Sequence, residues 1–263
     1  MAAAPSAWYN IIPIPQVSES VIMLKLYQFP VSHYCEKVRW ALELKDLPYR
    51  KVNLLPGPHV KKAKALAATS ELPILEHKSH IVQGSREIIT HLDNQFSRRP
   101  LTPEHPDARK LAMAWESYAD REIGPPVRLL WYHTMLEHKD TSVQMLSQDG
   151  PWYGTMMVKF AYPKMAEAMR EMMNINDDTA RQAVGQIEVA LNNIHETLGD
   201  NEFLVADTFT RADLAVASLL APLLMPKGYG SVWPETIPQP LLGHMADFNS
   251  RLGWVEHLYS NFR

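Results

Sequence analysis

Ser32–Trp40 (SHYCEKVRW), which follows the apolar run Met23–Tyr27 (MLKLY) after residues 28–31, is the stretch that decides the fold. Alternating apolar residues in the run predict a β-strand, and the residues after a short turn predict a helix over 34–44. The first turn of a helix has unpaired backbone N–H groups and a partial positive charge, so it favours anions such as thiolates. The sequence therefore predicts that Ser32 and Cys35 lie at a helix start suited to sulfur chemistry.

Residues 23–97 alternate between strand and helix patterns in the order βαβαββα. This order predicts a mixed four-stranded sheet with helices, and the spacing of Ser32 and Cys35 resembles a thioredoxin-like C-x-x-C turn in which Ser replaces the first Cys. The expected strands are Met23–Phe29, Tyr49–Leu55, Ile74–His77 and residues 81–82, and the expected helices are Tyr34–Leu44, a short helix that ends near Ala68, and a helix from an N-cap at Ser85 to about Phe96.

Residues 98–106 contain three prolines and no periodic apolar residues, which predicts a linker. Residues 107–263 follow a helical pattern almost throughout. One apolar stripe, with Gly199 as the expected residue after its helix, consists of Val184, Ile187, Leu191, Ile194 and Leu198. Thr210 and Asp213 resemble a capping box that opens an apolar helix. We therefore expect a thioredoxin-like α/β N-terminal domain and an all-α C-terminal helical bundle domain.

Composition limits the classes of function. The 263 residues carry a formal net charge of −3, which gives no general attraction to nucleic acid or to anionic membranes. A single Cys excludes an internal disulfide and fits a reducing compartment. Residues 1–22 contain no Lys or Arg, unlike signal or transit peptides, and three prolines disfavour a helix there, so an extended N-terminal arm and a cytoplasmic location are expected. No apolar run approaches the roughly 20 residues needed to cross a bilayer.

Four segments together resemble the glutathione S-transferase superfamily, and the resemblance covers most of the chain. They are Ser32–Arg39, at the position of the family's catalytic residue; Glu71–Leu75 (ELPIL), similar to its x-V-P-x-L segment; Gly84–Ile88 (GSREI), similar to its [EQ]-S-x-x-I helix start; and Phe209–Asp213 (FTRAD), similar to its [ST]-x-A-D box. The resemblance implies a cytosolic Ser-type, theta- or omega-like glutathione transferase that acts in detoxification. It also implies a homodimer, glutathione as co-substrate, no metal, and a small hydrophobic electrophile as the second substrate.

Ser32 is expected to donate a hydrogen bond to the sulfur of bound glutathione. A free thiol titrates near pH ~8.5, and each unit of pKa depression requires about 1.4 kcal/mol of thiolate stabilisation. The Ser32 hydroxyl and the helix start together would supply about one or two units. The structural alternative is that Ser32 only caps the helix. Tyr27 is the alternative candidate for thiol activation, because several classes of the family use a first-strand tyrosine. Strand alternation turns Tyr27 to the opposite face, however, and we expect it in the core.

The resemblance implies that glutathione is bound by His59, Leu72, Pro73, Gly84, Ser85 and Arg86. A cis Leu72–Pro73 bond would turn backbone groups toward the cysteinyl unit, as a sheet edge does. Ser85 at a helix start would hold the γ-glutamyl carboxylate, and His59 would reach the glycine end. A trans proline at a strand start, a plain helix cap and a surface histidine are the alternatives. Gly84 replaces the family's acidic or Gln residue, and Glu71 replaces a basic or polar one.

The pocket for the electrophile is expected between the two domains. Tyr34 would line it from the turn before the first helix, and Trp115 and Tyr118 would line it from one face of the first long helix of the second domain. Packing in the core is the alternative for all three aromatic residues. Residues 77–80 (HKSH) form a His-x-x-His on a turn with no third ligand nearby, so no metal site is expected.

Two other functional classes remain open. A glutathione-dependent thiol oxidoreductase would use Cys35, at the position of a resolving thiol, through a mixed disulfide with glutathione. The alternative for a lone Cys on the inward face of a helix is inert burial in the core. A non-catalytic ligand-binding protein of the same fold is the other class, because a fold by itself does not determine function.

Overall fold

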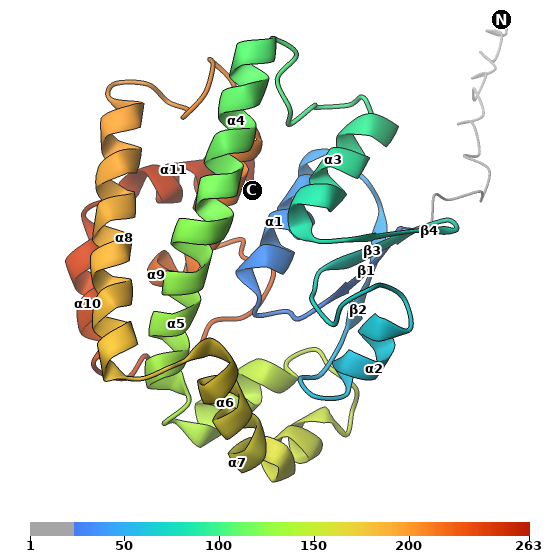
Figure 1. The fold of residues 1–263 in the computed structure, drawn as a ribbon, viewed down its shortest axis with the longest axis vertical. Helices are drawn as coiled ribbons and strands as arrows, with labels where there is room; N and C mark the ends of the chain where they lie inside the picture. The colour runs from blue at the N-terminus through green and yellow to red at the C-terminus, as the bar shows by residue number, and fades with distance from the viewer. Residues whose placement is uncertain (1–23) are drawn as a thin grey trace, which may run out of the picture.

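The computed structural model describes residues 24–263, so the expected N-terminal arm, residues 1–22, and Met23 lie outside the described residues. A small sheet with its own helices lies beside a larger group of helices (Figure 1). The predicted fold class, a thioredoxin-like α/β domain followed by an all-helical domain, is confirmed.

The sheet has the strand order β2-β1-β3-β4. Its strands are β1 (Leu24–Gln28), β2 (Tyr49–Asn53), β3 (Ile74–His77) and β4 (His80–Gln83), and its helices are α1 (His33–Leu44), α2 (His59–Lys64) and α3 (Ser85–Gln95). β1 pairs in parallel with β2 and antiparallel with β3, and β3 pairs antiparallel with β4. Because β1 and β2 are parallel, the turn before α1 and the loop before α2 lie at the same edge of the sheet.

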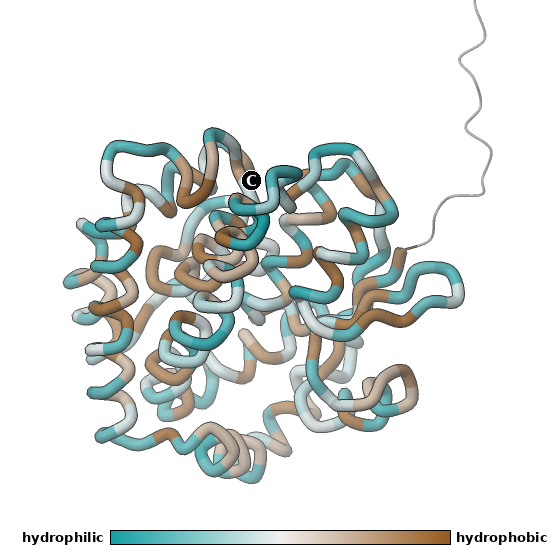
Figure 2. Tube along the Cα trace, turned by 45° about the horizontal axis from the view of Figure 1, so that its top comes forward, coloured by the Kyte–Doolittle hydropathy of each residue, from teal (hydrophilic) through white to brown (hydrophobic). Residues whose placement is uncertain are grey.

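The second domain is helical, as predicted. Its elements are α4 (Pro106–Tyr118), the π-helical turn η1 (Ala119–Ile123), α5 (Gly124–Met135), α6 (Lys139–Ser147), α7 (Gly154–Met173), α8 (Asp177–Leu198), α9 (Arg211–Leu224), α10 (Leu241–Asn249) and α11 (Gly253–Phe262). Figure 2 shows α8 with hydrophilic residues along its outer side and hydrophobic residues facing its neighbours, which is the expected stripe ending at Gly199. The linker is one residue shorter than expected, because Pro106 is the first residue of α4, where its missing N–H costs nothing.

α9 is the central helix of this domain, and every residue from Arg211 to Leu223 is buried. Its start is fixed by the predicted capping box. The Thr210 Oγ1 accepts a hydrogen bond from the Ala212 N–H at 3.2 Å, and the Asp213 carboxylate accepts from the Thr210 N–H at 2.8 Å. The same carboxylate accepts from the Leu204 N–H at 2.8 Å, so it also anchors the loop that leads into the helix.

Trp40 on α1 connects the two domains through apolar contacts. Its side chain is fully buried, and its ring centroid lies 5.5 Å from that of Phe209 and 4.4 Å from that of Tyr259. Its Nε1 donates a hydrogen bond to the Phe262 carbonyl at 2.6 Å. The largest apolar core therefore extends across both domains and does not end at the linker.

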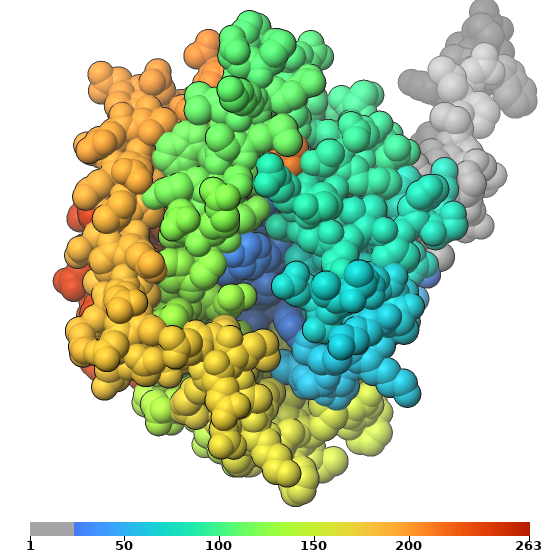
Figure 3. Space-filling model, in the orientation of Figure 1, coloured from blue at the N-terminus to red at the C-terminus, as the bar shows by residue number. Residues whose placement is uncertain are grey.

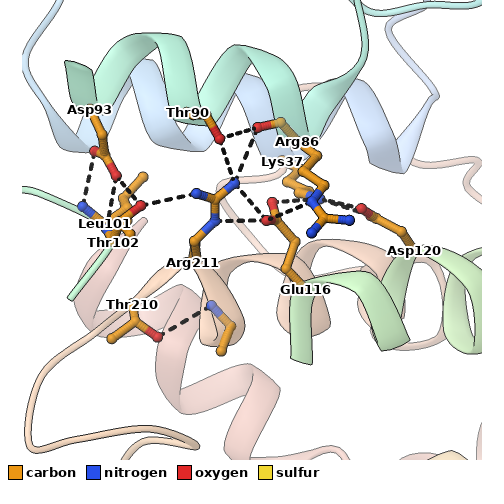
Figure 4. Close-up of polar contacts among 11 residues, drawn as sticks. Lys37, Arg86, Thr90, Asp93, Leu101, Thr102, Glu116, Asp120, Thr210 and Arg211 are labelled. Atoms are coloured by element: carbon orange, nitrogen blue, oxygen red, sulfur yellow. Dashed lines mark hydrogen bonds and ion pairs between the residues drawn. The ribbon is translucent and has the colours of Figure 1, made fainter. Parts of the chain in front are cut away.

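A buried ionic network joins α1, α4 and α9 (Figure 4). Lys37, Glu116 and Arg211 lie on these three helices, and their side chains are at most 1% exposed. Glu116 Oε1 lies 3.0 Å from Lys37 Nζ, and Glu116 Oε2 lies 2.7 Å from Arg211 Nε. One buried carboxylate thus compensates two buried cations that come from different domains.

Further contacts extend the network to α3 and η1. Lys37 Nζ donates to both carboxylate oxygens of Asp120, at 2.8 and 3.0 Å. The Arg211 guanidinium donates to three oxygens on α3 and the linker: the Arg86 carbonyl at 3.1 Å, Thr90 Oγ1 at 3.0 Å and Thr102 Oγ1 at 3.0 Å. The network therefore holds the helical domain against α1 and α3, the two helices whose first residues belong to the predicted glutathione site.

Removing the central carboxylate tests this role. We expect Glu116→Gln to lower the free energy of unfolding by about 3–5 kcal/mol, because the change leaves the buried Arg211 guanidinium without a carboxylate and Lys37 with Asp120 alone. Urea unfolding followed by circular dichroism measures the loss. Asp178→Asn is the matched control, since its ion pair with Arg181 is exposed to solvent and is worth no more than about 1 kcal/mol. Equal, small losses in both variants would show that the network does not hold the domains together.

Candidate active site

A cavity of about 690 Å³ lies between the two domains. In Figure 3 it is the hollow between the green helical segment and the teal and cyan sheet domain, with blue N-terminal residues at its floor. Its sheet-domain wall includes Ser32, Tyr34, His59, Leu72, Pro73, Gly84, Ser85 and Arg86, all of which were selected from the sequence. The structure brings these residues to one surface.

Ser32 is the N-cap of α1, the structural role that the sequence analysis gave as its alternative. Its Oγ accepts a hydrogen bond from the Cys35 N–H at 3.3 Å, and its own N–H donates to the Phe29 carbonyl at 3.1 Å. The side chain is half-buried and faces the cavity. A hydroxyl that accepts one hydrogen bond keeps its own hydrogen available for donation. The capping role and the proposed role toward sulfur are therefore compatible in the same side chain.

Arg39 supports the turn before α1 from the side away from the solvent. Its guanidinium donates to the Pro30 carbonyl at 3.0 Å and to Gln28 Oε1 at 2.8 Å. Its charge is compensated by Glu36, whose carboxylate lies 2.7 Å from Arg39 Nε. Arg263 Nε lies 2.8 Å from the other oxygen of Glu36. The end of the chain thus helps to fix the turn, a contact that sequence reasoning missed because the partners lie more than two hundred residues apart.

The start of α3 differs from the prediction by one residue. Gly84 is the N-cap, with φ of +98°, and Ser85 is the first helical residue, nearly buried and facing the cavity. A positive φ favours glycine over any residue with a side chain. A Cβ at position 84 would also overlap the carboxylate of Glu87, which occupies the space above Gly84 and lines the cavity. Ser85 still presents its hydroxyl and backbone at a helix start.

The remaining sheet-domain positions complete this wall. The Leu72–Pro73 peptide bond is cis, as expected, and the Pro73 carbonyl accepts from the Gly84 N–H at 3.0 Å, which ties the two segments together. His59 stacks edge-on against Phe29 at 4.8 Å between ring centroids, and partial burial lowers the pKa of its imidazole. Both segments therefore face the cavity beside the turn that carries Ser32.

Comparison with known proteins gives the family. The sequence matches the glutathione S-transferase N-terminal domain over residues 26–100 and the glutathione S-transferase C-terminal domain over residues 153–239. The chain belongs to the glutathione S-transferase superfamily.

Individual relatives of the superfamily agree with this assignment. Glutathione S-transferase U4 of Arabidopsis thaliana is 27% identical over 106 residues, which are 39% of this chain and 46% of that protein. Glutathione S-transferase 1 of Dianthus caryophyllus is 32% identical over 97 residues, 36% of this chain and 43% of that protein. The chain therefore spans somewhat less than half the length of these curated relatives. A solved glutathione S-transferase from Methylobacterium radiotolerans, in complex with glutathione sulfonate, shares the fold with a TM-score of 0.62 at 21% identity and covers 91% of each chain.

Cys35 lies away from the cavity of this glutathione S-transferase fold. The side chain is fully buried in the interior, and it is not among the residues that line the cavity. Burial raises the pKa of the Cys35 thiol, so the neutral thiol is favoured over the reactive thiolate. The geometry favours the packing interpretation of Cys35 over a mixed disulfide with glutathione.

The aromatic residues expected in the electrophile pocket divide into two groups. Tyr34 lines the cavity, and its hydroxyl donates to the Asp120 carbonyl at 2.7 Å. The Tyr34 hydroxyl and ring occupy the space that a side chain at position 124 would fill, where the chain has Gly124. Trp115 and Tyr118, in contrast, pack against the core away from the cavity, and the Tyr118 hydroxyl accepts from Asn193 Nδ2 at 2.8 Å. That prediction is corrected by the structure.

The correction has a physical reason. The sequence analysis assigned Trp115 and Tyr118 to the pocket because they share one face of the first long helix of the second domain, whereas the π-helical turn η1 follows Tyr118 directly and separates α4 from α5. Trp131 and Tyr132 on α5 therefore line the cavity in place of Trp115 and Tyr118. The rest of this wall is mostly apolar and includes Trp233, Val232, Leu146, Met145, Met169, Met172 and Met173.

His33 follows Ser32 directly and is almost completely buried. Burial, assisted by the nearby positive charge of Arg128, lowers the pKa of His33 from 6.5 to about 3. The folded protein therefore holds His33 neutral, while the unfolded chain protonates it below about pH 6.5. The stability that comes from this burial is present above pH 6.5 and is lost as the pH falls toward 3.

This linkage predicts a pH dependence of stability that one substitution removes. Between pH 6.5 and about pH 5, the neutral, buried His33 should lower the free energy of unfolding by about 1.4 kcal/mol for each unit by which the pH falls. The loss over this range is about 2 kcal/mol in total. Urea unfolding at both pH values should show that His33→Gln flattens this part of the profile. His195→Gln, which changes an exposed histidine on α8, should keep the wild-type slope. An unchanged slope in His33→Gln would contradict the neutral state of His33.

Proposed function

We propose that the protein is a glutathione transferase that activates the thiol of bound glutathione for attack on a small hydrophobic electrophile. The observation that carries this proposal is the position of Ser32, whose hydroxyl lies at the start of α1 and faces the cavity between the domains. In the reaction, the thiolate sulfur forms a bond to the electrophilic carbon and the leaving group departs with its electron pair. The thiol proton is released to solvent.

Thiol activation is assigned to Ser32 and the first turn of α1. A hydrogen bond to a charged acceptor is worth about 1.5–3 kcal/mol, which corresponds to about one to two units of pKa. Arg39 and the Phe29 carbonyl hold the turn in place before substrate binds. The donor is therefore preorganised, so that little reorganisation is needed when the thiolate forms. The position of Ser32 supports a Ser-type mechanism, and a theta- or omega-like subclass is part of the same proposal.

Glutathione binding is assigned to the rest of the sheet-domain wall. Ser85, in the first turn of α3, would hold the γ-glutamyl carboxylate with its hydroxyl and backbone N–H. Glu87 would accept from the γ-glutamyl ammonium, because its carboxylate stands above Gly84, which itself has no side chain to offer. Leu72 would bond the cysteinyl unit through its backbone, and His59 would face the glycine end. Among the residues that the structure describes, no group of His, Cys, Asp and Glu is suited to a metal ion.

The other proposed properties follow from the family. A homodimer, a role in detoxification and a cytoplasmic location are proposals, supported by membership of the superfamily. Within residues 24–263, none of the helices combines the length and the apolar character that crossing a membrane requires. Of the alternatives, thiol exchange through Cys35 is disfavoured by the burial of that residue, and a non-catalytic binding role is distinguished by the kinetic test below.

Replacing Ser32 tests thiol activation. We expect Ser32→Ala to raise the pKa of bound glutathione by about one to two units and to lower kcat/KM near pH 6.5 by about 10- to 100-fold. Thiolate absorbance during pH titration of the complex, together with conjugation of chlorodinitrobenzene, measures both effects. Ser79→Ala on the exposed β3–β4 turn is the matched control and should behave as wild type. Cys35→Ala should retain conjugation; if wild type instead reduced a glutathione mixed disulfide and Cys35→Ala alone lost that reduction, the oxidoreductase interpretation would replace ours.

Replacing Glu87 tests the assignment of the γ-glutamyl ammonium. We expect Glu87→Gln to weaken binding of reduced glutathione by about ten-fold, because a charge-assisted hydrogen bond is lost. Calorimetry with the des-amino analogue, in which a glutaryl group replaces the γ-glutamyl group, provides the comparison. The analogue should bind wild type and Glu87→Gln with similar affinity. An equal loss for both ligands would mean that Glu87 acts on the fold of the site and does not bind the ammonium.

A further inference from the structure

Arg128 is a cation in the otherwise apolar helical-domain wall of the cavity. It lies on α5, three and four residues before Trp131 and Tyr132, so the three side chains share one face of the helix. The side chain is exposed to solvent and lines the cavity. Ser32 and His33 line the same cavity as Arg128, and the positive charge of Arg128 lowers the pKa of His33.

Two other charged groups of the cavity, one on η1 and one on α3, already have partners. Asp120 is bound by Lys37 Nζ at 2.8 Å, and Arg86 Nε lies 4.0 Å from the Glu116 carboxylate. Arg128 forms no ion pair with any of residues 24–263. A solvated cation at this position is therefore available to a ligand that enters the cavity.

Apart from Asp120, which Lys37 already binds, the acidic groups of the cavity lie on the opposite wall. Glu71 and Glu87 belong to the sheet domain, and both are exposed in the cavity lining. The sheet-domain wall is thus suited to a cationic group of the first ligand, and the helical-domain wall at Arg128 is suited to an anionic group of the second. This separation of charge argues that the anion bound by Arg128 belongs to the electrophile.

The surface next to Arg128 is aromatic. The rings of Trp131 and Trp233 lie 5.9 Å apart between centroids, and Trp131 Nε1 already donates to the Pro222 carbonyl at 2.8 Å. With this donor occupied, the Trp131 surface that faces the cavity offers apolar contact. A flat, apolar body against these rings would leave a substituent about one helical turn away, where Arg128 lies.

We propose that the electrophile is an aromatic carboxylate, with its carboxylate bound by Arg128 and its ring against Trp131 and Trp233. The planar guanidinium matches a carboxylate through two parallel hydrogen bonds. This inference rests on the proposed transferase function and narrows its second substrate from any small hydrophobic electrophile to an anionic one. In the test reaction, the glutathione thiolate forms a C–S bond at the ring carbon, chloride leaves with the C–Cl electron pair, and the thiol proton goes to solvent.

The test compares two electrophiles of similar size, one anionic and one neutral. A chlorodinitrobenzoate and the corresponding chlorodinitrobenzamide are conjugated by the full chain, with each rate corrected for the uncatalysed reaction. We expect the ratio of kcat/KM, benzoate over benzamide, to fall by about ten-fold in Arg128→Gln, which is the loss of one charge-assisted contact at an exposed site. Arg128→Lys should keep part of the wild-type benzoate-to-benzamide ratio, because the lysine ammonium still attracts the carboxylate as a point charge. In wild type the ratio should also fall as salt is raised, because the contact is open to solvent.

Arg121→Gln is the matched control. Arg121 lies in η1 and is exposed, but it does not line the cavity, so its removal changes the net charge equally without touching the site. We expect it to leave the benzoate-to-benzamide ratio at the wild-type value. An equal fall in both variants would overturn the proposal, because it would reflect the overall charge of the protein.

The remaining outcomes separate this inference from the proposed function. If wild type conjugates both electrophiles and Arg128→Gln leaves the ratio unchanged, Arg128 does not select the electrophile and the transferase function stands. If Arg128→Gln weakens calorimetric binding of glutathione and leaves the ratio unchanged, Arg128 binds glutathione and the inference is wrong. If wild type shows no glutathione-dependent turnover with either compound, the proposed function fails and this inference fails with it.

Discussion

Glu116 compensates two buried cations that come from different parts of the chain, and the cavity exists in its present shape because this carboxylate holds them together. Lys37 belongs to α1 of the sheet domain, and Arg211 opens α9 of the helical domain. Taking such charges out of water costs several kcal/mol for each ion, a cost that only close opposite charges and hydrogen bonds can offset. Here the Glu116 oxygens lie 2.6 to 3.0 Å from nitrogens of Lys37 and Arg211. The Thr102 hydroxyl and the Arg86 carbonyl accept further hydrogen bonds from Arg211 and complete the compensation. A shift of one domain would separate the charges, so the two cavity walls keep a fixed spacing.

The same principle fixes the turn that carries Ser32. Glu36 and Arg39 are buried and do not line the cavity, and Arg39 donates to the Pro30 carbonyl, two residues before Ser32. Arg263 and the Gly230 N–H supply the remaining hydrogen bonds to Glu36. The chemistry assigned to Ser32 needs a donor held in place before the thiolate forms, and these buried contacts supply the rigidity.

The local elements were predictable because their signals lie close together in the sequence. The N-cap at Ser32 and the reciprocal cap between Thr210 and Asp213 each depend on residues three positions apart. The cavity lining from the sheet domain was predictable for a different reason, since the resemblance to a family carried whole segments with it. The N-cap of α3 was misplaced by one residue because Ser is the usual capping residue, whereas the turn requires the positive φ that Gly84 adopts.

The helical-domain wall of the cavity and the buried ion pairs were not predictable, because they depend on contacts that residue spacing does not reveal. Trp115 and Tyr118 were expected in the pocket because they share one face of a helix, and the π-helical turn that separates α4 from α5 has no strong sequence signal. The pairing of Glu36 with Arg263, and of Glu116 with Arg211, joins residues far apart in the chain. Charged residues on a predicted helix are ordinarily assigned to the solvent, so their burial became visible only in three dimensions.

Calorimetric titration of the full chain with reduced glutathione tests the central claim most directly. Our interpretation of the sheet-domain wall predicts saturable binding with a dissociation constant in the millimolar range or below, and weaker binding when Ser85 is replaced by Ala. The absence of any binding heat at millimolar glutathione, in a sample shown to be folded, would contradict the assignment of this cavity to glutathione and leave the fold without its proposed chemistry.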